Sequence, residues 1–173
     1  MIKIISGKFK GRKLQEVPNL YVRPTQAVVR KSMMQILEPF HGASVLDLYA
    51  GVGTLGLEAL SRGASQLTSV ENNRIVLKTL QKNFELVCKD EDIDIKGMDV
   101  DRFLEINLKK FDIIFADPPY TKADYFTLKK LIIPFLNEGG VFCMEMKRCY
   151  INDETARIKK YGSSQVVFWR AEV

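Results

Sequence analysis

The sequence predicts an α/β protein built around a doubly wound, mostly parallel sheet. Short apolar runs typical of buried strands alternate along most of the chain with longer segments that have helical periodicity. This alternation indicates right-handed βαβ units with helices on both faces of the sheet. Glycines or acidic residues follow several strands, and open sheets of this kind bind ligands at that carboxyl edge. A chain of 173 residues is long enough for one such domain.

Residues 1–40 are expected to form a basic hairpin and a helix that together bind RNA, ahead of a catalytic core at residues 41–173. The hairpin strands are expected near residues 3–5 and 11–17, and the helix at residues 26–38. Thr25 is the expected N-cap of this helix, because its hydroxyl can accept a hydrogen bond from the first turn.

One face of the predicted helix at residues 26–38 is apolar and is expected to pack on the core; it contains Val29, Met33, Ile36 and Leu37. Arg30 and Lys31 lie away from this stripe. The same helix is therefore expected to pack on the sheet and to point cations at a phosphate backbone.

The core alternates strands with helices. Strands are expected near residues 44–48, 66–70, 93–97, 111–116 and 140–146, and helices near residues 54–62, 73–87, 100–108 and 122–133. A turn over residues 137–140 should precede the fifth strand, because it contains two consecutive glycines. Residues 152–160 are expected to be mostly loop and strand, paired through a turn at Gly162 with a strand at residues 165–169.

The most informative motif is Asp117-Pro118-Pro119-Tyr120, at the end of the apolar run 111–116. The prolines fix the backbone and remove two N–H donors, so this strand exit presents hydrogen-bond acceptors. The ring of Tyr120 offers a flat surface for stacking. Such a pocket suits a heterocyclic amine, although a strand that ends in a Pro-Pro turn beside a chance acid remains an alternative.

A glycine-rich turn follows the strand at residues 44–48. Gly51, Gly53 and Gly56 match the dinucleotide-binding pattern, and Glu71 lies twenty residues after the first of them, where a ribose-binding acid is expected. This spacing fits a nicotinamide enzyme and an adenosyl-cofactor enzyme equally well.

Two further acids separate these possibilities. Asp47, four residues before Gly51, would repel a pyrophosphate and favour a ligand that carries an ammonium and a sulfonium. S-adenosylmethionine carries both groups and no phosphate. Asp99 follows the strand at residues 93–97 and is placed to accept a hydrogen bond from an adenine amine. Either acid alone is explained by helix capping, but the set lies along one rim of the predicted sheet.

With these motifs the chain resembles the RsmD family of bacterial 16S ribosomal RNA guanine-N2 methyltransferases. The resemblance rests on residues 7–14 (G-K-F-K-G-R-K-L), Arg23-Pro24-Thr25 with Arg30, the D-P-P-Y motif, and the segment L-D-L-Y-A-G-V-G-T-L-G-L-E-A-L-S-R. Val52 replaces the usual small serine, and Tyr120 a frequent phenylalanine. The resemblance implies a class I, Rossmann-like methyltransferase fold. It adds that the seventh strand is antiparallel and inserted between the fifth and the sixth.

The resemblance and the motifs together give the candidate site residues. The predicted catalytic residues are Asp117, Pro118, Pro119 and Tyr120, and the predicted S-adenosylmethionine-binding residues are Asp47, Ala50, Gly51, Gly53, Glu71, Asn72, Asp99 and Val100. The predicted RNA-binding residues are Lys8, Lys10, Arg12, Lys13, Arg23, Thr25 and Arg30. No metal site is predicted.

The basic charge is concentrated near the N-terminus. Residues 1–40 contain eight Lys or Arg and two acidic side chains, against 18 and 19 in the remaining residues. A basic segment beside a nearly neutral core is typical of a protein that clamps nucleic acid, although a solvated charged hairpin has the same composition. Ribosomal RNA, within the small subunit or an assembly intermediate, is the expected partner.

Other functions remain as alternatives. The acceptor could be adenine N6 in DNA or RNA, because the motif at Asp117 suits any planar amine. A non-catalytic RNA-binding module and a nucleotide-dependent oxidoreductase are alternatives of another class, against which Asp47 and the two prolines argue. The three scattered cysteines, the lack of an apolar run of membrane-spanning length and the lack of a signal peptide lead us to expect a cytoplasmic protein, and a monomer is assumed.

Overall fold

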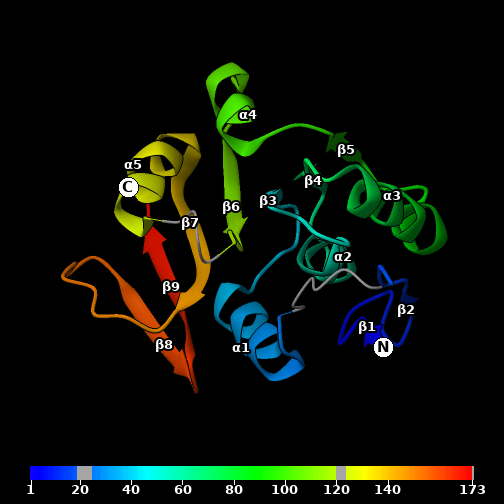
Figure 1. Cartoon of the computed structure of the whole chain (residues 1–173), viewed down its shortest axis with the longest axis horizontal. Helices are drawn as coiled ribbons and strands as arrows, with labels where there is room; N and C mark the ends of the chain where they lie inside the picture. Colours follow the sequence, from blue (N-terminus) through cyan, green and yellow to red (C-terminus); the bar gives the residue numbers. More distant parts are fainter. Residues whose placement is uncertain (19–24, 120–123, 173) are drawn as a thin grey trace.

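A computed structural model describes residues 1–18, 25–119 and 124–172 of the chain (Figure 1). The strands of the main sheet are β3 (Ser44–Leu48), β4 (Gln66–Val70), β5 (Ile93–Lys96), β6 (Phe111–Ala116), β7 (Leu136–Lys147), β8 (Arg157–Tyr161) and β9 (Ser164–Arg170). The helices are α1 (Ala27–Leu37), α2 (Thr54–Ser61), α3 (Arg74–Cys88), α4 (Val100–Ile106) and α5 (Tyr125–Ile132), with a 3₁₀ turn, η1, at Ile133–Phe135.

The sheet has the predicted doubly wound topology. Its seven strands follow the order β5-β4-β3-β6-β7-β9-β8. Strands β3 to β7 pair in parallel, whereas β9 pairs antiparallel with both β7 and β8. The seventh strand of this sheet, β9, therefore lies antiparallel between the fifth and the sixth, as the resemblance implied, and both predictions are confirmed.

Each face of the sheet packs against its own set of helices. One apolar cluster joins α1, α2 and α3 to residues such as Phe115 and Cys143, and the other joins α4 and α5 to their strand neighbours Ile114 and Met144. Successive residues of a strand point to opposite faces, so a strand covered on both sides must be apolar throughout. This double burial explains the continuous apolar runs in the sequence.

Several local predictions differ from the structure, among them the hairpin strands expected at residues 3–5 and 11–17, which are only two residues long, at Ile2–Lys3 and Lys13–Leu14. Helix α1 begins at Ala27 after Gln26, which makes no side-chain cap, so the prediction that Thr25 is the N-cap is wrong. The predicted turn at residues 137–140 instead lies within β7, where the pairing with β6 shifts register between Phe111 and Ile113. The glycines allow this irregularity, which lets the strand continue without a separate turn.

The N-terminal hairpin is short and is docked on α2. Its strands are β1 (Ile2–Lys3) and β2 (Lys13–Leu14). The Ile5 N–H donates to Glu58 Oε1 at 2.6 Å, and the Phe9 N–H donates to Ser61 Oγ at 2.9 Å. Figure 1 shows the hairpin beside α2 and α3. Residues 1–14 are thereby attached to the face of the core that carries these helices.

Arg30 does not point outward. Its side chain is 4% exposed, its Nε lies 3.3 Å from Glu58 Oε1, and its Nη2 donates to the Lys3 carbonyl at 2.8 Å. Burial lowers the pKa of Arg30 and raises the pKa of Glu58. The expectation that Arg30 offers its charge to a phosphate backbone is therefore wrong, because the fully buried Glu58 on α2 requires a cationic partner.

Candidate active site

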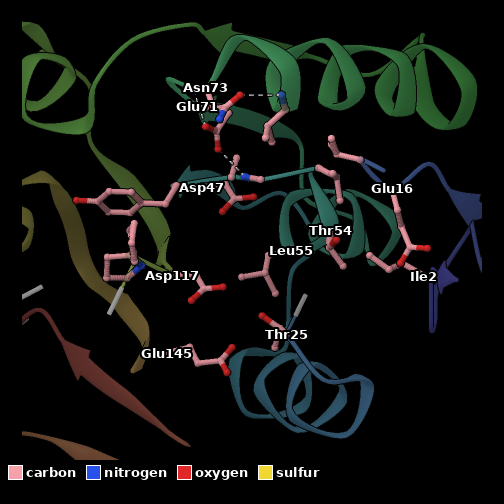
Figure 2. A pocket seen from close by; sticks show the side chains of 18 of the residues that line it. Ile2, Glu16, Thr25, Asp47, Thr54, Leu55, Glu71, Asn73, Asp117 and Glu145 are labelled. Atoms are coloured by element: carbon pink, nitrogen blue, oxygen red, sulfur yellow. Dashed lines mark hydrogen bonds between the residues drawn. The ribbon is translucent and has the colours of Figure 1, made fainter. Parts of the chain in front are cut away.

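A cavity of about 1130 Å³ opens at the carboxyl edge of the sheet. Its walls come from the ends of β3, β4 and β6, from β7, and from the N-terminal segment around Glu16 and Thr25 (Figure 2). Asp47, Glu71 and Asp117, predicted from three separate strand ends, all lie in this wall. The parallel register explains why, since the strands β3, β4 and β6 are neighbours and end at the same edge.

The turn after β3 needs its glycines. Gly51 and Gly53 have φ angles of 58° and 91°, which side-chain-bearing residues rarely adopt. A Cβ atom on Gly53 would also lie 2.7 Å from the Leu80 side chain of α3. The backbone of the turn therefore packs closely on α3, and Ala50, Gly51 and Val52 line the cavity.

Glu71 connects the glycine turn to the start of α3. Its Oε2 accepts the Gly51 N–H at 3.0 Å, and its Oε1 accepts the Asn73 N–H at 2.8 Å. Figure 2 shows Glu71 and Asn73 at one end of the cavity. The carboxylate thus fixes two backbone segments while facing the space that a ligand would occupy.

Asp47 is a buried carboxyl group in the wall of the cavity. It is 2% exposed, and its Oδ2 accepts the Gly56 N–H at 3.1 Å. The pKa of Asp47 is raised to about 7, mainly by burial; the hydrogen bond from Gly56 lowers it and the nearby charge of Glu71 adds to the rise. A buried acid in this state gains from a cationic ligand, because a positive charge beside it favours the ionised form.

Asp99 is attached to the rim through Asn72. Its Oδ2 accepts from Asn72 Nδ2 at 3.2 Å, and its Oδ1 caps α4 by accepting the Asp101 N–H at 3.0 Å. Asn72 and Val100 line a second hollow of about 20 Å³ with Tyr49, which also lines the main cavity. The residues predicted for the adenine end therefore gather at one corner of the site.

The other end of the cavity is formed by the segment after β6. Asp117 is half-buried, Pro118 is buried, and both line the cavity together with Pro119. Tyr120 lies outside the described residues. Figure 2 shows the Asp117 carboxylate pointing into the hollow from the side opposite Thr25.

Sequence reasoning missed several wall residues. Glu145 in β7 is 6% exposed and was not predicted at all, whereas Thr25, which is 7% exposed, was predicted only as an N-cap and an RNA contact; both line the cavity near Asp117. The signal for Glu145 was an acid inside an otherwise apolar run, which is costly unless it has a role. Tyr49 carried no signal, although its φ of 58° marks a strained position beside the site.

The N-terminal segment is tied to this site by Asn83 of α3. Asn83 Nδ2 donates to the Val52 carbonyl at 2.9 Å and to the Gln15 carbonyl at 3.1 Å, while its Oδ1 accepts the Gln15 N–H at 2.8 Å. One buried amide thus fixes the glycine turn and the chain that follows the hairpin. That chain, including Glu16, forms part of the cavity wall.

A comparison with known protein families matches residues 2–170 to the family described as Conserved hypothetical protein 95. The chain belongs to this family, the RsmD family of methyltransferases. One relative is the Haemophilus influenzae protein named Ribosomal RNA small subunit methyltransferase D, which is 36% identical over 143 residues that cover 80% of this chain and 72% of the relative.

Solved structures share the fold. The putative methyltransferase yhhF from Escherichia coli superposes with a TM-score of 0.86 at 31% identity, covering 99% of this chain and 98% of that one. An RNA methyltransferase from Salinibacter ruber, solved with S-adenosyl-L-homocysteine, has a TM-score of 0.68 at 14% identity and covers 86% and 94% of the two chains. The predicted class I methyltransferase fold is confirmed.

The cofactor of the RsmD family is S-adenosylmethionine, and the residues of this cavity fit it. Asp47 offers a buried carboxyl group to a cation, and the glycine turn lets a ligand approach the backbone closely. Among the described residues, no group of three or more His, Cys, Asp or Glu side chains is placed to hold a metal ion. No helix in the described ranges is long and apolar enough to cross a membrane.

The structure does not gather the predicted RNA-binding residues of this RsmD-family chain into one surface. Lys8, Lys10, Arg12 and Lys13 are exposed on or near the hairpin, but Thr25 lines the cavity and Arg23 lies outside the described residues. Lys8 Nζ lies 2.6 Å from Glu91 Oε1, and Arg12 Nη1 donates to the Val87 carbonyl at 2.5 Å. Arg12 is therefore bound to the C-terminal end of α3, and Lys8 to the segment that follows this helix, away from the residues of α3 that line the cavity.

Proposed function

We propose that this protein methylates the exocyclic N2 amine of a guanine in the 16S ribosomal RNA of the small subunit. The observation that carries the proposal is that Asp117 and its two prolines open into the same cavity as Asp47 and the glycine turn. A methyl donor and an acceptor base can therefore meet in one space. The name of the Haemophilus influenzae relative supports the choice of ribosomal RNA as substrate.

Different residues of the cavity bind different parts of the donor. Asp47 and the turn at Gly51 hold the charged amino-acid end, because the buried carboxyl group is matched by an ammonium. Glu71 accepts from the ribose hydroxyls, and Asp99 with Asn72 receives the adenine edge. When bound, S-adenosylmethionine supplies an electrophilic methyl group on a sulfonium.

The acceptor end has to orient a weak nucleophile. The lone pair of the guanine amine is shared with the ring, and the Asp117 carboxylate accepts one of its N–H groups to favour the attacking geometry. Alignment of this kind contributes up to roughly 7–11 kcal/mol in ideal cases. The methylated amine is strongly acidic before it loses its proton, so an ordinary carboxylate such as Asp117 can accept that proton. Tyr120 is the proposed stacking partner of a base that has left its neighbours.

Ribosomal RNA is proposed to reach the cavity along the N-terminal hairpin. Lys10 and Lys13 are exposed there, and the chain after the hairpin forms part of the cavity wall. Cations at this place attract a phosphate backbone without reading its sequence. In this proposal residues 1–40 are the RNA-binding part and residues 41–173 the catalytic core.

The nucleoside that receives the methyl group tests the proposed function. Small subunits from cells that lack this gene are incubated with the protein and radiolabelled S-adenosylmethionine, and the RNA is digested to nucleosides for mass spectrometry. We expect label in N2-methylguanosine at one position. Subunits from cells that contain the gene are the control, because their target is already methylated and should take up little label.

Other results would contradict the proposal at different levels. Label in N6-methyladenosine would retain the fold and the chemistry but replace the acceptor. If no methyl group is transferred to RNA although the protein still binds S-adenosylhomocysteine, the protein binds the cofactor but methylates another acceptor.

A further inference from the structure

Glu145 is a buried acid that the proposed mechanism does not yet use. It is 6% exposed and lines the cavity, while its neighbours Met144 and Met146 pack in the apolar cluster on the opposite face of the sheet. Because it lines the cavity, its carboxyl group can contact a ligand that occupies this space.

The sheet register places Glu145 beside Asp117. Ala116 of β6 pairs with Met144 of β7, so Asp117 and Glu145 each follow a paired position and face the same side of the sheet. Neighbouring strands lie about 4.8 Å apart. Figure 2 shows both carboxylates directed into the same hollow, across from Thr25. The acceptor end of the cavity therefore presents two adjacent carboxylates.

We propose that Glu145 determines base specificity by accepting the N1–H of the target guanine while Asp117 accepts from its N2 amine. This inference rests on the proposed function and names the residue that selects the base. Guanine carries these two donors side by side on its Watson–Crick edge. Adenine carries an unprotonated N1, which is an acceptor, next to its amine. A pair of adjacent carboxylates can accept both hydrogen bonds from the guanine edge, whereas on the adenine edge one of the carboxylates faces another acceptor.

Rejection of the wrong base follows from burial. A buried carboxylate that faces an unprotonated N1 loses its hydrogen bond and meets a second acceptor instead, so the mismatched base binds and reacts more slowly. Sites built to bind a specific donor discriminate strongly against analogues that lack it. Glu145 is a specificity residue in this proposal because it touches the base without touching the transferred methyl group.

The test replaces the target guanine by 2-aminopurine, which keeps the exocyclic 2-amine but lacks the 6-oxo group and has no hydrogen on N1. Since the loss of the oxo group is common to all enzyme variants, the change in base preference on replacing Glu145 reports the contact with N1. Small subunits are reconstituted with RNA that carries either base at the nucleotide labelled in the first experiment. The values of kcat/KM are then compared for the wild type and for Glu145→Gln. The glutamine keeps the shape of the side chain, and its amide can donate to the unprotonated N1.

We expect the wild type to prefer guanine over 2-aminopurine by about 100-fold or more. In Glu145→Gln this preference should fall at least about tenfold, and the rate on 2-aminopurine should exceed that of the wild type. Glu138→Gln is the matched control, since Glu138 lies on the same strand, β7, but is exposed and away from the cavity wall. It should retain the wild-type preference.

A failure of this inference can be distinguished from a failure of the proposed function. Equal rates of the wild type on the two bases, or an unchanged preference in Glu145→Gln, would overturn the role of Glu145 and leave guanine methylation intact. A wild type that methylates no guanine would overturn the proposed function and this inference together. The wild type alone can be compared on the two bases. The proposal can therefore still be contradicted if Glu145→Gln does not fold.

Discussion

Asp47 changes its charge over the neutral range, and this property couples cofactor binding to pH. Burial raises the pKa of Asp47 to about 7, so roughly a tenth of the carboxyl groups are ionised one pH unit below that value and roughly nine-tenths one unit above it. The ammonium of the amino-acid end favours the ionised form of Asp47. The affinity for S-adenosylhomocysteine should therefore rise about tenfold between pH 6 and pH 8.

Calorimetric titration of the wild type and of Asp47→Asn across this pH range checks the prediction. The variant should bind S-adenosylhomocysteine more weakly and with little dependence on pH, because its amide does not ionise. A pH dependence that survives in Asp47→Asn would assign the effect to a group other than Asp47.

Single residues also explain where the sequence pattern misleads. Arg30 lies off the apolar stripe of α1, so periodicity places it outside, yet it is paired with Glu58 of α2. Nothing in the local sequence reveals a buried partner on another helix. The pattern assigns Thr25 to a helix cap for a similar reason, because its place in the cavity wall depends on how α1 meets the sheet.

At the level of elements, the hairpin depends on a close contact with α2. Gly7 has a φ of 82°, and a Cβ atom there would lie 1.8 Å from the Ser61 carbonyl oxygen. Gly11 has the same φ, but a Cβ atom there would meet no other atom of the described residues within 4 Å. At both positions a residue with a side chain would have to adopt a strained left-handed backbone. Only at Gly7 would its Cβ atom also clash with Ser61.

The substitution Gly7→Ala should lower the free energy of unfolding by at least about 2 kcal/mol more than Gly11→Ala does. Urea denaturation of the two variants and the wild type measures the difference. Equal losses would mean that the hairpin does not pack on α2 as described, since only the clash separates the two substitutions.

Helices and strands are predicted best where the order of apolar and polar residues alone determines them. The apolar runs identify the strands, and because parallel strands end together, Asp47, Glu71 and Asp117 can be assigned to one site without knowledge of their contacts. Glu145 escapes this reasoning because it lies inside a strand rather than at its end. Its place beside Asp117 follows from strand order and register, which a linear pattern does not contain.

For the whole molecule, the proposed function places RNA against the hairpin. If Lys10 and Lys13 contact phosphates, the double variant Lys10→Ala/Lys13→Ala should lower kcat/KM for small subunits. It should also reduce the slope of log(kcat/KM) against log salt concentration by up to about 2, one for each cation removed.

The matched control is Lys109→Ala/Lys110→Ala, which removes the same charge from exposed residues before β6, at the edge of the sheet away from the cavity. This variant should keep the wild-type slope. Equal changes in both variants would mean that only the net charge of the protein matters. An unchanged slope in the hairpin variant would mean that Lys10 and Lys13 do not contact RNA phosphates.

The central claim is that one cavity holds the methyl donor and an acceptor base that Asp117 positions. The most direct measurement compares Asp117→Asn with the wild type in single-turnover methyl transfer to small subunits at saturating S-adenosylmethionine, alongside calorimetric affinity for S-adenosylhomocysteine. We expect transfer to slow about 100-fold or more while the affinity stays within about threefold. Undiminished transfer, or a loss of cofactor affinity equal to the loss of rate, would contradict this claim.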